Sequence, residues 1–526
     1  MRDFHFPGRS AVYATNGMCA TSHPLAAKTA IDLLQQGGNA VDAAIGAAVL
    51  LGIAEPQMTG LGGDCFALVK PAGSEEVIAL NGSGRAPAAL SADTLREAGH
   101  SAMPLREAAA VTLPGAVDAF CRLSEKMGTL GLDRTLAPAI RYADQGIPVA
   151  PRVAFDWASD AASLQGDART HFLLDGAVPR PGQVFRAPGQ AEVLRRIARD
   201  GRAAFYEGEI AAEMTRTLRA AGGVHTEADF AAVEATWDSP VTGTYKDTDL
   251  LEHPPNGQGV AAILMANILA QFDLPSLDPF GAQRAHIEAE AAKLAYDARN
   301  RFVADPAHMT RMAHLLSNDT AARLAALIDP RRAMPDPGHA AETVHRETIY
   351  ITVVDRDRMA VSLIYSIFHG FGSGIATPRH GILLHNRGAG FSLVPGHPNE
   401  AAGGKRPMHT IIPAMLREGG RITLPFGVMG GAYQANGHAR FLTNTVDYGM
   451  DPQDAIDAPR SFWDAGDLKV ERGYADAVRA ELAEMGHRVV VPDTPIGGAQ
   501  AIRIDPESGV LQGGSDPRKD GCALGY

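Results

Sequence analysis

A short apolar run that follows a polar stretch places the strongest constraint on how this chain can fold. Residues 349–354 read Ile-Tyr-Ile-Thr-Val-Val, and Thr348 stands directly before them. Such a run predicts a strand that is buried on both faces. If the chain were cut just before Thr348, its hydroxyl would be a nucleophile and its new α-amine the base. Without a cut, Thr348 is an ordinary β-branched residue at the start of a strand.

The sequence around this strand predicts both helices and strands on either side of it. Residues 329–345 are rich in proline and charge, which predicts an exposed linker. Residues 349–354 and 359–364 flank a charged turn and predict a hairpin. Other strands are expected at residues 65–69, 77–81, 382–384, 411–416, 422–426, 488–491 and 501–504. Helices are expected at residues 23–36, 40–51, 190–199, 209–221, 260–269 and 281–302, with Asn39 or Asp42 as the cap of the second. Helices packed outside β-sheets are the natural arrangement for such a chain.

Composition excludes several classes of partner. The chain has 526 residues, with 45% apolar and 21% charged residues and a net charge of −12. It shows no basic run, which argues against nucleic acid and anionic membranes as partners. The longest apolar run, residues 43–54, is too short to cross a bilayer. The N-terminus lacks the apolar core of a signal peptide, so a cytoplasmic protein is expected.

The cysteines and histidines show no metal-binding spacing. Cys19, Cys65, Cys121 and Cys522 are scattered and are expected to be buried, reduced thiols. The sequence contains no Cys-x-x-Cys and no His-Glu-x-x-His. No metal site is therefore predicted.

The order and spacing of several motifs carry a resemblance to a known family. The chain resembles the γ-glutamyltransferase (glutathione hydrolase) family of N-terminal-nucleophile hydrolases over essentially its whole length. The matching stretches are residues 37–44, 56–63, 113–115, 305–306, 348–355, 371–374, 404–407, 429–431 and 515–521.

The resemblance implies a fold and a maturation step. It implies an α+β protein, a four-layer αββα sandwich of the N-terminal-nucleophile hydrolase type, formed jointly by two subunits. The proenzyme would cleave itself between Glu347 and Thr348 into a large subunit, residues 1–347, and a small subunit, residues 348–526, which stay associated. The Thr348 hydroxyl would attack the Glu347 carbonyl, and water would open the resulting ester. In the mature enzyme the same hydroxyl would attack an amide, and water or an acceptor amine would resolve the acyl-enzyme, so that no cofactor is expected.

Three further positions match catalytic elements of the family. Gly430 and Gly431 match the oxyanion-hole glycines, whose backbone N–H groups would stabilise the tetrahedral intermediate. A plain loop turn is the alternative for this pair. Ser366 falls where the family usually has a second threonine that supports the nucleophile. An exposed loop serine is the alternative there.

The substrate-binding motifs depart from the family pattern. Ser83 stands where the family has an arginine that grips the substrate α-carboxylate, and Arg85 follows two residues later. In the second motif, Asn386 is kept, Arg387 replaces a glutamine, and Gly390 replaces the aspartate that would bind the substrate α-amine. A site that has lost this anion and gained a cation would reject a buried ammonium and favour a carboxylate. Arg387 is predicted to clamp that carboxylate, with a structural or solvated arginine as the alternative.

Other positions complete the predicted substrate site. His409 and Thr410 replace the paired serines of the family, and Phe368 replaces an asparagine. His409 and Thr410 are predicted to contact substrate, although a structural histidine is the alternative for His409. The shift of the first motif leaves open whether Arg85 replaces the missing arginine.

These departures look like the oxamate amidohydrolase branch of the family. The predicted function is therefore hydrolysis of a small amide that carries a carboxylate. Two alternatives remain: a γ-glutamyltransferase or glutathione hydrolase, and an unprocessed, inactive binding homologue. The physiological substrate, the balance of hydrolysis and transfer, and the oligomeric state stay open, with a homodimer of processed units as one option.

Overall fold

Two seven-stranded sheets form the centre of the molecule. The computed structural model describes His5, residues 8–335 and residues 348–526. Every neighbouring pair of strands within these two sheets is antiparallel. The first sheet has the order β19 (Cys522–Gly525), β2 (Met18–Thr21), β10 (Ile349–Val354), β11 (Ala360–Ser366), β3 (Asp64–Lys70), β4 (Ile78–Gly82) and β7 (Thr236–Asp238). The second has the order β1 (Val12–Ala14), β18 (Leu511–Ser515), β17 (Gly498–Ile504), β13 (Arg421–Met429), β12 (Ala414–Glu418), β9 (Thr248–Glu252) and β8 (Val241–Tyr245).

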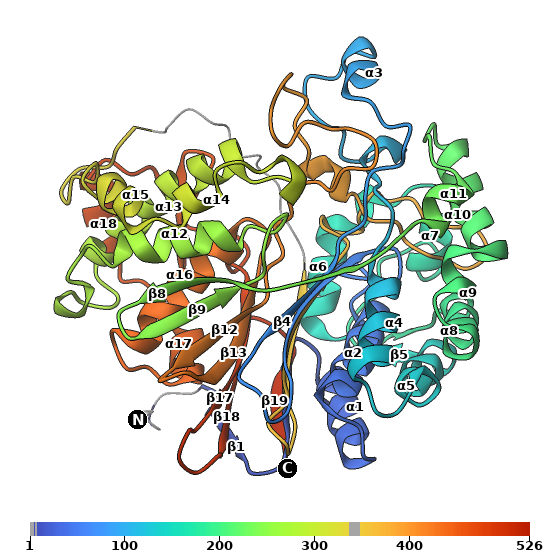
Figure 1. The fold of residues 1–526 in the computed structure, drawn as a ribbon, viewed down its shortest axis with the longest axis horizontal. Helices are drawn as coiled ribbons and strands as arrows, with labels where there is room; N and C mark the ends of the chain where they lie inside the picture. The colour runs from blue at the N-terminus through green and yellow to red at the C-terminus, as the bar shows by residue number, and fades with distance from the viewer. Residues whose placement is uncertain (1–4, 6–7, 336–347) are drawn as a thin grey trace.

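The two sheets pack face to face and are covered by helices on their outer sides (Figure 1). One apolar cluster between them draws side chains from both sheets, including Leu68, Val354, Met415 and Ile502. Two smaller sheets lie outside this stack: β14 (Ser461–Asp464), β15 (Asp467–Val470) and β16 (Val489–Val490), and β5 (Ile147–Pro148) with β6 (Val184–Phe185).

The helices divide into two groups, one on each outer side (Figure 1). On the side of the first sheet lie α1 (Pro24–Gln35), α2 (Ala40–Ala54), α4 (Ala116–Met127), α5 (Leu132–Gln145), α6 (Pro151–Asp160), α7 (Asp167–Phe172), α8 (Pro188–Asp200), α9 (Ala203–Tyr206), α10 (Gly208–Ala220) and α11 (Glu227–Ala231). On the side of the second sheet lie α12 (Gly259–Leu269), α13 (Ala282–Phe302), α14 (Met312–Leu315), α15 (Asn318–Ala325), α16 (Tyr433–Val446), α17 (Pro452–Asp457) and α18 (Asp476–Glu484). The short α3 (Ala92–Glu97) projects at the top of the view.

The predicted helices and the hairpin are confirmed. Asn39 and Asp42 act together at the start of α2: the Asn39 side chain accepts from the Asp42 N–H, and the Asp42 carboxylate accepts from the Asn39 N–H. This is a capping box. Every residue of α2 is buried, since the helix packs between α1, α5 and the strands β10 and β11. Strands β10 and β11 form the expected hairpin in the middle of the first sheet.

Two strand predictions are corrected. Residues 382–384 form no strand; Leu383 and Leu384 make only isolated bridges, and the Leu384 carbonyl accepts from the Ser373 hydroxyl instead. The strand expected from residue 411 begins at Ala414. The reason is that the Ile411 and Ile412 N–H groups donate to the side chains of His409 and Gln434 rather than to a neighbouring strand.

Segments from before and after Thr348 alternate in both sheets. In the first sheet, β10 and β11 lie between β2 and β3. In the second, β12, β13, β17 and β18 lie between β1 and β9. Each sheet is therefore built from both sides of the predicted cut. Most of the expected linker, residues 336–345, lies outside the described residues; its described part, residues 329–335, is exposed or half-buried.

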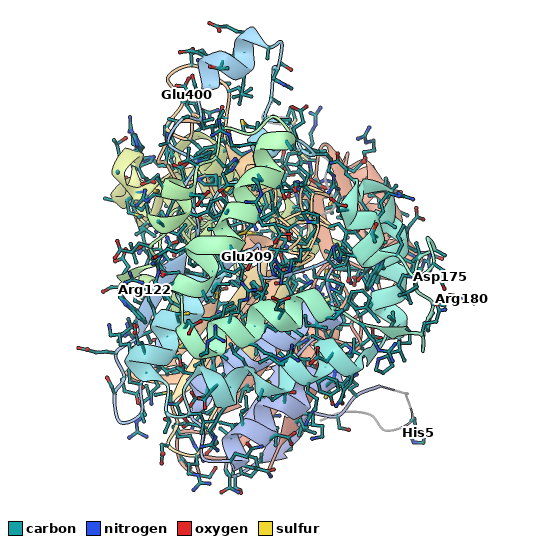
Figure 2. All side chains as sticks on the ribbon, turned by 90° about the vertical axis from the view of Figure 1, so that its right-hand side faces the viewer. His5, Arg122, Asp175, Arg180, Glu209 and Glu400 are labelled. Carbon is teal, nitrogen blue, oxygen red and sulfur yellow. The ribbon has the colours of Figure 1, made fainter. Side chains whose placement is uncertain are left out.

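The surface is charged, and nothing in the described part resembles a membrane span. Asp175, Arg180 and Glu209 are exposed (Figure 2), and Glu209 pairs with Arg196. Among residues 8–335 and 348–526, no helix has both the length and the apolar character that crossing a bilayer needs. The four cysteines are free thiols; three are buried as expected, whereas Cys522 is half-buried.

Candidate active site

Thr348 lies at the entrance of β10 and contacts Ser366 at the end of β11. The hairpin register pairs Ile349 with Tyr365, so Thr348 and Ser366 stand across from each other. The Thr348 Oγ1 donates to the Ser366 Oγ at 3.3 Å, and both residues are buried. The Ser366 Oγ also accepts from the Phe368 N–H at 2.9 Å. The alternative of an exposed loop serine is therefore wrong for Ser366.

The Arg387 guanidinium is buried against this pair. Arg387 begins the short 3₁₀-helix η5 (Arg387–Gly390), and its side chain is fully buried. Its Nη2 donates to the Ser366 Oγ at 3.3 Å and its Nη1 donates to the Thr410 Oγ1 at 3.1 Å. The Phe368 ring covers one face of the guanidinium at 4.0 Å. Arg387 is thus not a solvated arginine, and the structure brings Thr348, Ser366, Arg387 and Thr410 together.

Asp64 is the charged group that sequence reasoning missed. It is the first residue of β3, fully buried, and its register partner is Ser366. Its Oδ1 accepts from the Gly84 and Gly115 N–H groups at 3.0 and 3.3 Å. A carboxylate at the head of an apolar strand was the available signal, because aspartate is almost never fully buried without partners.

Two histidines and Arg387 surround the second Asp64 oxygen. Its Oδ2 lies 3.1 Å from His409 Nε2, 3.5 Å from His385 Nδ1 and 4.0 Å from Arg387 Nε. Burial alone would raise the pKa of the Asp64 carboxyl, but these three neighbours hold it below its usual value. Burial, with help from Arg387, lowers the pKa of His409 to about 3, so this ring is neutral. Asp64 and Arg387 are therefore opposite charges within one buried cluster.

Gly430 and Gly431 form the turn between β13 and α16. Their φ angles are +119° and +57°, a backbone region that favours glycine. A Cβ on Gly430 would also lie 2.9 Å from the Gly497 Cα. Gln258 links this turn to Thr410, the residue that accepts a hydrogen bond from Arg387. Its Nε2 donates to the carbonyls of Gly431 and Thr410 at 3.0 and 2.6 Å. The turn is thus near Thr410, while its role as an oxyanion hole stays a prediction.

The remaining predicted site residues are engaged elsewhere. The half-exposed Arg85 guanidinium pairs with Asp305 at 3.3 Å and donates to the Gly404 carbonyl at 3.0 Å. The buried Asn386 amide accepts from the His369 N–H and donates to the Leu105 carbonyl. His409 donates to Asp64, as a structural histidine would. A direct substrate role for Arg85, Asn386 or His409 stays a prediction.

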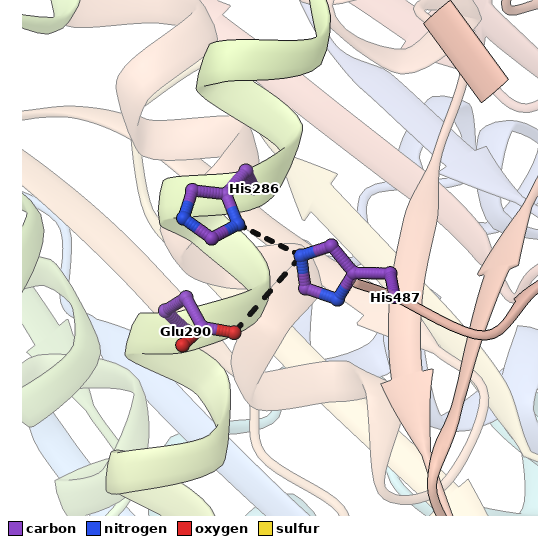
Figure 3. A group of neighbouring side chains, drawn as sticks. All are labelled: His286, Glu290 and His487. Carbon is purple, nitrogen blue, oxygen red and sulfur yellow. Dashed lines mark hydrogen bonds and ion pairs between the residues drawn. The ribbon is translucent and has the colours of Figure 1, made fainter. Parts of the chain in front are cut away.

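A second buried cluster holds groups of the kind that bind metals (Figure 3). His286 and Glu290 lie on α13, and His487 follows α18. His286 Nδ1 lies 2.8 Å from His487 Nε2, which lies 4.0 Å from Glu290 Oε1. Histidine nitrogens and a carboxylate are ligands that Zn²⁺ accepts. However, the Lys293 ammonium already bonds Glu290 Oε1 at 2.7 Å and supplies the positive charge that this carboxylate needs.

The same cluster also holds residues 329–334, which precede Thr348 in the chain. His286 Nε2 lies 2.8 Å from the Asp329 carbonyl, and the Met334 N–H donates to Glu290 at 2.8 Å. Burial, and next the Lys293 charge, lowers the pKa of His487 to about 3. We therefore assign the cluster a structural role that joins α13 to two other segments.

Substitution of Lys293 tests this structural role. Lys293→Met is expected to leave Glu290 buried and uncompensated and to lower the free energy of unfolding by about 3–5 kcal/mol. Denaturant unfolding would measure the change. Lys28→Met is the matched control, because the exposed Lys28–Asp32 pair is worth at most about 1 kcal/mol. Equal effects of the two substitutions would contradict the assignment.

Comparison with known proteins places the chain in a family. The family described as gamma-glutamyltranspeptidase matches residues 26–526. The crystal structure of a cephalosporin acylase from Bacillus halodurans superposes with a TM-score of 0.93 at 37% identity, covering 100% of this chain and 99% of that one. The glutathione hydrolase-like YwrD proenzyme of Bacillus subtilis is 36% identical over 98% of this chain and 99% of its own. The oxamate amidohydrolase proenzyme of Klebsiella pneumoniae is 35% identical over 98% and 100%.

The chain thus combines a mixed α/β fold, a buried threonine at the start of a strand and a match to one family over residues 26–526. The chain belongs to the gamma-glutamyltranspeptidase family. It is an enzyme of the amide hydrolase and acyltransferase class, and the resemblance inferred from its motifs is confirmed.

Proposed function

We propose that this enzyme cleaves itself before Thr348 and then hydrolyses a short amide that carries a carboxylate, with oxamate as the type of substrate. The observation that carries the proposal is the contact chain from Thr348 through Ser366 to Arg387. Each of the two links is 3.3 Å long. The predicted nucleophile and a buried cation are therefore separated by one serine hydroxyl.

This separation favours a short substrate. An attacked carbonyl carbon lies about 3–3.5 Å from its nucleophile, and a carboxylate oxygen lies about 2.7–2.9 Å from a guanidinium nitrogen. With one serine hydroxyl between Thr348 and Arg387, a substrate whose amide and carboxylate carbons are adjacent or nearly so fits best. Oxamate meets this condition, because its two carbons are directly bonded. A γ-glutamyl group places a chain of carbons between them.

Gly390 supports the same choice. In the family an aspartate at this position binds the substrate α-amine, as the resemblance implies. Here a Cβ on Gly390 would lie 2.5 Å from the Met408 carbonyl oxygen, closer than such contacts allow. An aspartate therefore does not fit without a shift of the backbone. The absence of this aspartate favours a substrate without an α-amine, and this argues against the γ-glutamyltransferase alternative.

The roles of the other residues follow from the proposed reaction. The Thr348 hydroxyl would attack the amide, and the new α-amine would handle the proton. Ser366 would hold the hydroxyl, and the Gly430 and Gly431 N–H groups would face the oxyanion. Arg387 and Thr410 would hold the carboxylate. Glu347, on the other side of the proposed cut, lies outside the described residues.

The arrangement of the sheets supports the two-subunit form of the proposal. Helices outside two stacked sheets fit a four-layer αββα sandwich of the N-terminal-nucleophile hydrolase type. Both sheets contain strands from each side of Thr348. Residues 1–347 and 348–526 would therefore stay associated as large and small subunits after the cut. A cytoplasmic location stays a prediction.

Turnover of two substrates side by side tests the substrate class. Ammonia release from oxamate, with little aniline release from a γ-glutamyl anilide, is the expected result. The opposite result would mean that the γ-glutamyl pocket survives and that the interpretation of Gly390 is wrong. An intact mass that shows one full-length species without activity would instead support the inactive binding homologue.

A further inference from the structure

His385 and Asp64 face each other, but no hydrogen lies between the His385 Nδ1 and the Asp64 Oδ2. The His385 Nε2 lies 2.7 Å from the Thr112 carbonyl, which can only accept, and 3.4 Å from the Thr112 hydroxyl; the shorter contact assigns the ring's proton to Nε2. The Nδ1 of the neutral ring is then a bare acceptor. It lies 3.5 Å from the Asp64 Oδ2, and among the described residues no donor bonds to it. Two acceptors thus face each other in a fully buried site.

His409, the other histidine at Asp64, does not share this mismatch. Its Nε2 donates to the Asp64 Oδ2 at 3.1 Å, and its Nδ1 accepts from the Ile411 N–H at 3.4 Å. The neutral ring of His409 therefore satisfies both partners. His385 is the histidine at which an added proton would create a new hydrogen bond, from Nδ1–H to Asp64.

The charge of the Asp64, His385, His409 and Arg387 cluster explains when that proton would arrive. Arg387 is positive and Asp64 is negative, so the cluster has no net charge while both histidines are neutral. A substrate carboxylate on Arg387 would add one buried negative charge, which is costly unless it is compensated. Burial, with the Arg387 cation, keeps the pKa of His385 low. An acid bound to Arg387 would offset the effect of that cation.

We infer that His385 takes up one proton from solvent when an acidic substrate binds to Arg387, forming an Nδ1–H bond to Asp64. The inference rests on the proposed function and makes His385 and Asp64 residues that determine specificity for anions. Both are positioning residues, since they act on the substrate through Arg387. Other ionisable groups that face this pair are Arg387, His409, His225, Cys65 and Arg406, and in a cut chain the Thr348 α-amine.

The inference fixes the sign of a pH dependence. Uptake of a proton on binding means that affinity falls as pH rises. Between the pKa of His385 in the free enzyme and its higher value in the complex, KM for oxamate should rise about tenfold per pH unit. Above that window KM should level off. If His385 had only a structural role, its substitution would change KM by the same factor at every pH.

Calorimetry on the processed enzyme tests proton uptake without turnover. The probe is glycolate, a monovalent acid of similar size, titrated in buffers of different ionisation enthalpy. The expected uptake is about one proton per acid bound in the wild type and about zero in His385→Gln, which keeps a donor for the Thr112 carbonyl. His225→Gln is the matched control: His225 is buried, its Nε2 lies 2.8 Å from a carbonyl, but no carboxylate faces its Nδ1 within ion-pair distance among the described residues.

The outcomes separate this inference from the proposed function. Binding with no proton uptake in the wild type would overturn the inference alone. Equal uptake in the wild type and His385→Gln would also overturn it, because the proton would then go elsewhere. If glycolate does not bind and oxamate is not hydrolysed, both the proposed function and the inference fail. Because His385→Gln could disturb folding, the slope of KM against pH in Asp64→Asn, expected to be flat, serves as a second test.

Discussion

Thr348→Ala is expected to yield a single uncut chain of 526 residues that has lost its amidase activity. The substitution removes the hydroxyl that would attack both the peptide bond before it and the substrate. Loss of a hydrolase nucleophile lowers kcat by roughly 10⁶-fold. The intact mass of the purified protein measures the cut, and ammonia release from oxamate measures the activity.

Thr348→Ser is the control for this substitution. Serine keeps the hydroxyl that donates to Ser366, so this variant should still be cut and still be active, although less so. Fragments of residues 1–347 and 348–526 from Thr348→Ala would show that another group performs the cut. The assignment of Thr348 as nucleophile would then be wrong.

Arg387→Gln is expected to lower kcat/KM for oxamate roughly 30- to 5,000-fold. This corresponds to a loss of about 2–5 kcal/mol of transition-state stabilisation. The change should fall mainly on KM, because Arg387 is proposed to hold the substrate carboxylate in both the ground state and the transition state. The loss should be large because the guanidinium is fully buried and a bound acid would be left without a counter-charge. Steady-state kinetics on oxamate measures both constants.

Arg85→Gln is the matched control for Arg387. The Arg85 guanidinium is half-exposed and pairs with Asp305. Its removal should therefore reduce transition-state stabilisation, measured as kcat/KM, by at most about 1 kcal/mol. Self-cleavage of Arg387→Gln would show that the surroundings of Thr348 are intact. A kcat/KM that falls more in Arg85→Gln than in Arg387→Gln would place the carboxylate clamp at the first motif instead.

Local pattern predicted the parts of the fold that depend on neighbours in the chain. The hairpin around residues 355–358 and the capped helix α2 are examples, since their apolar runs and caps are local. The strand expected at residues 382–384 failed because an apolar triplet can be buried in a loop as well as in a sheet. Only tertiary hydrogen bonds, such as the one from Ser373 to Leu384, decide between the two.

The candidate site also contains residues that the sequence predicts and one that it does not. Thr348, Ser366 and Arg387 were found because each stands at a position defined by a strand or a family motif, and the structure brings them together. Asp64 was missed because its significance depends on His385, His409 and Arg387, which follow it by more than three hundred residues. No local pattern reveals that a carboxylate is buried among such distant partners.

The alternation of segments within both sheets has a consequence for a chain that has been cut. Folding of the uncut precursor is unimolecular, but the same sheets in a cut enzyme are shared by two molecules. Unfolding would then be a dissociation, and its midpoint would rise with protein concentration. Refolding would require two different chains to meet, so it would be a second-order reaction. A cut enzyme would thus recover from denaturation more slowly as it is diluted, whereas its uncut Thr348→Ala precursor would recover at a rate independent of dilution.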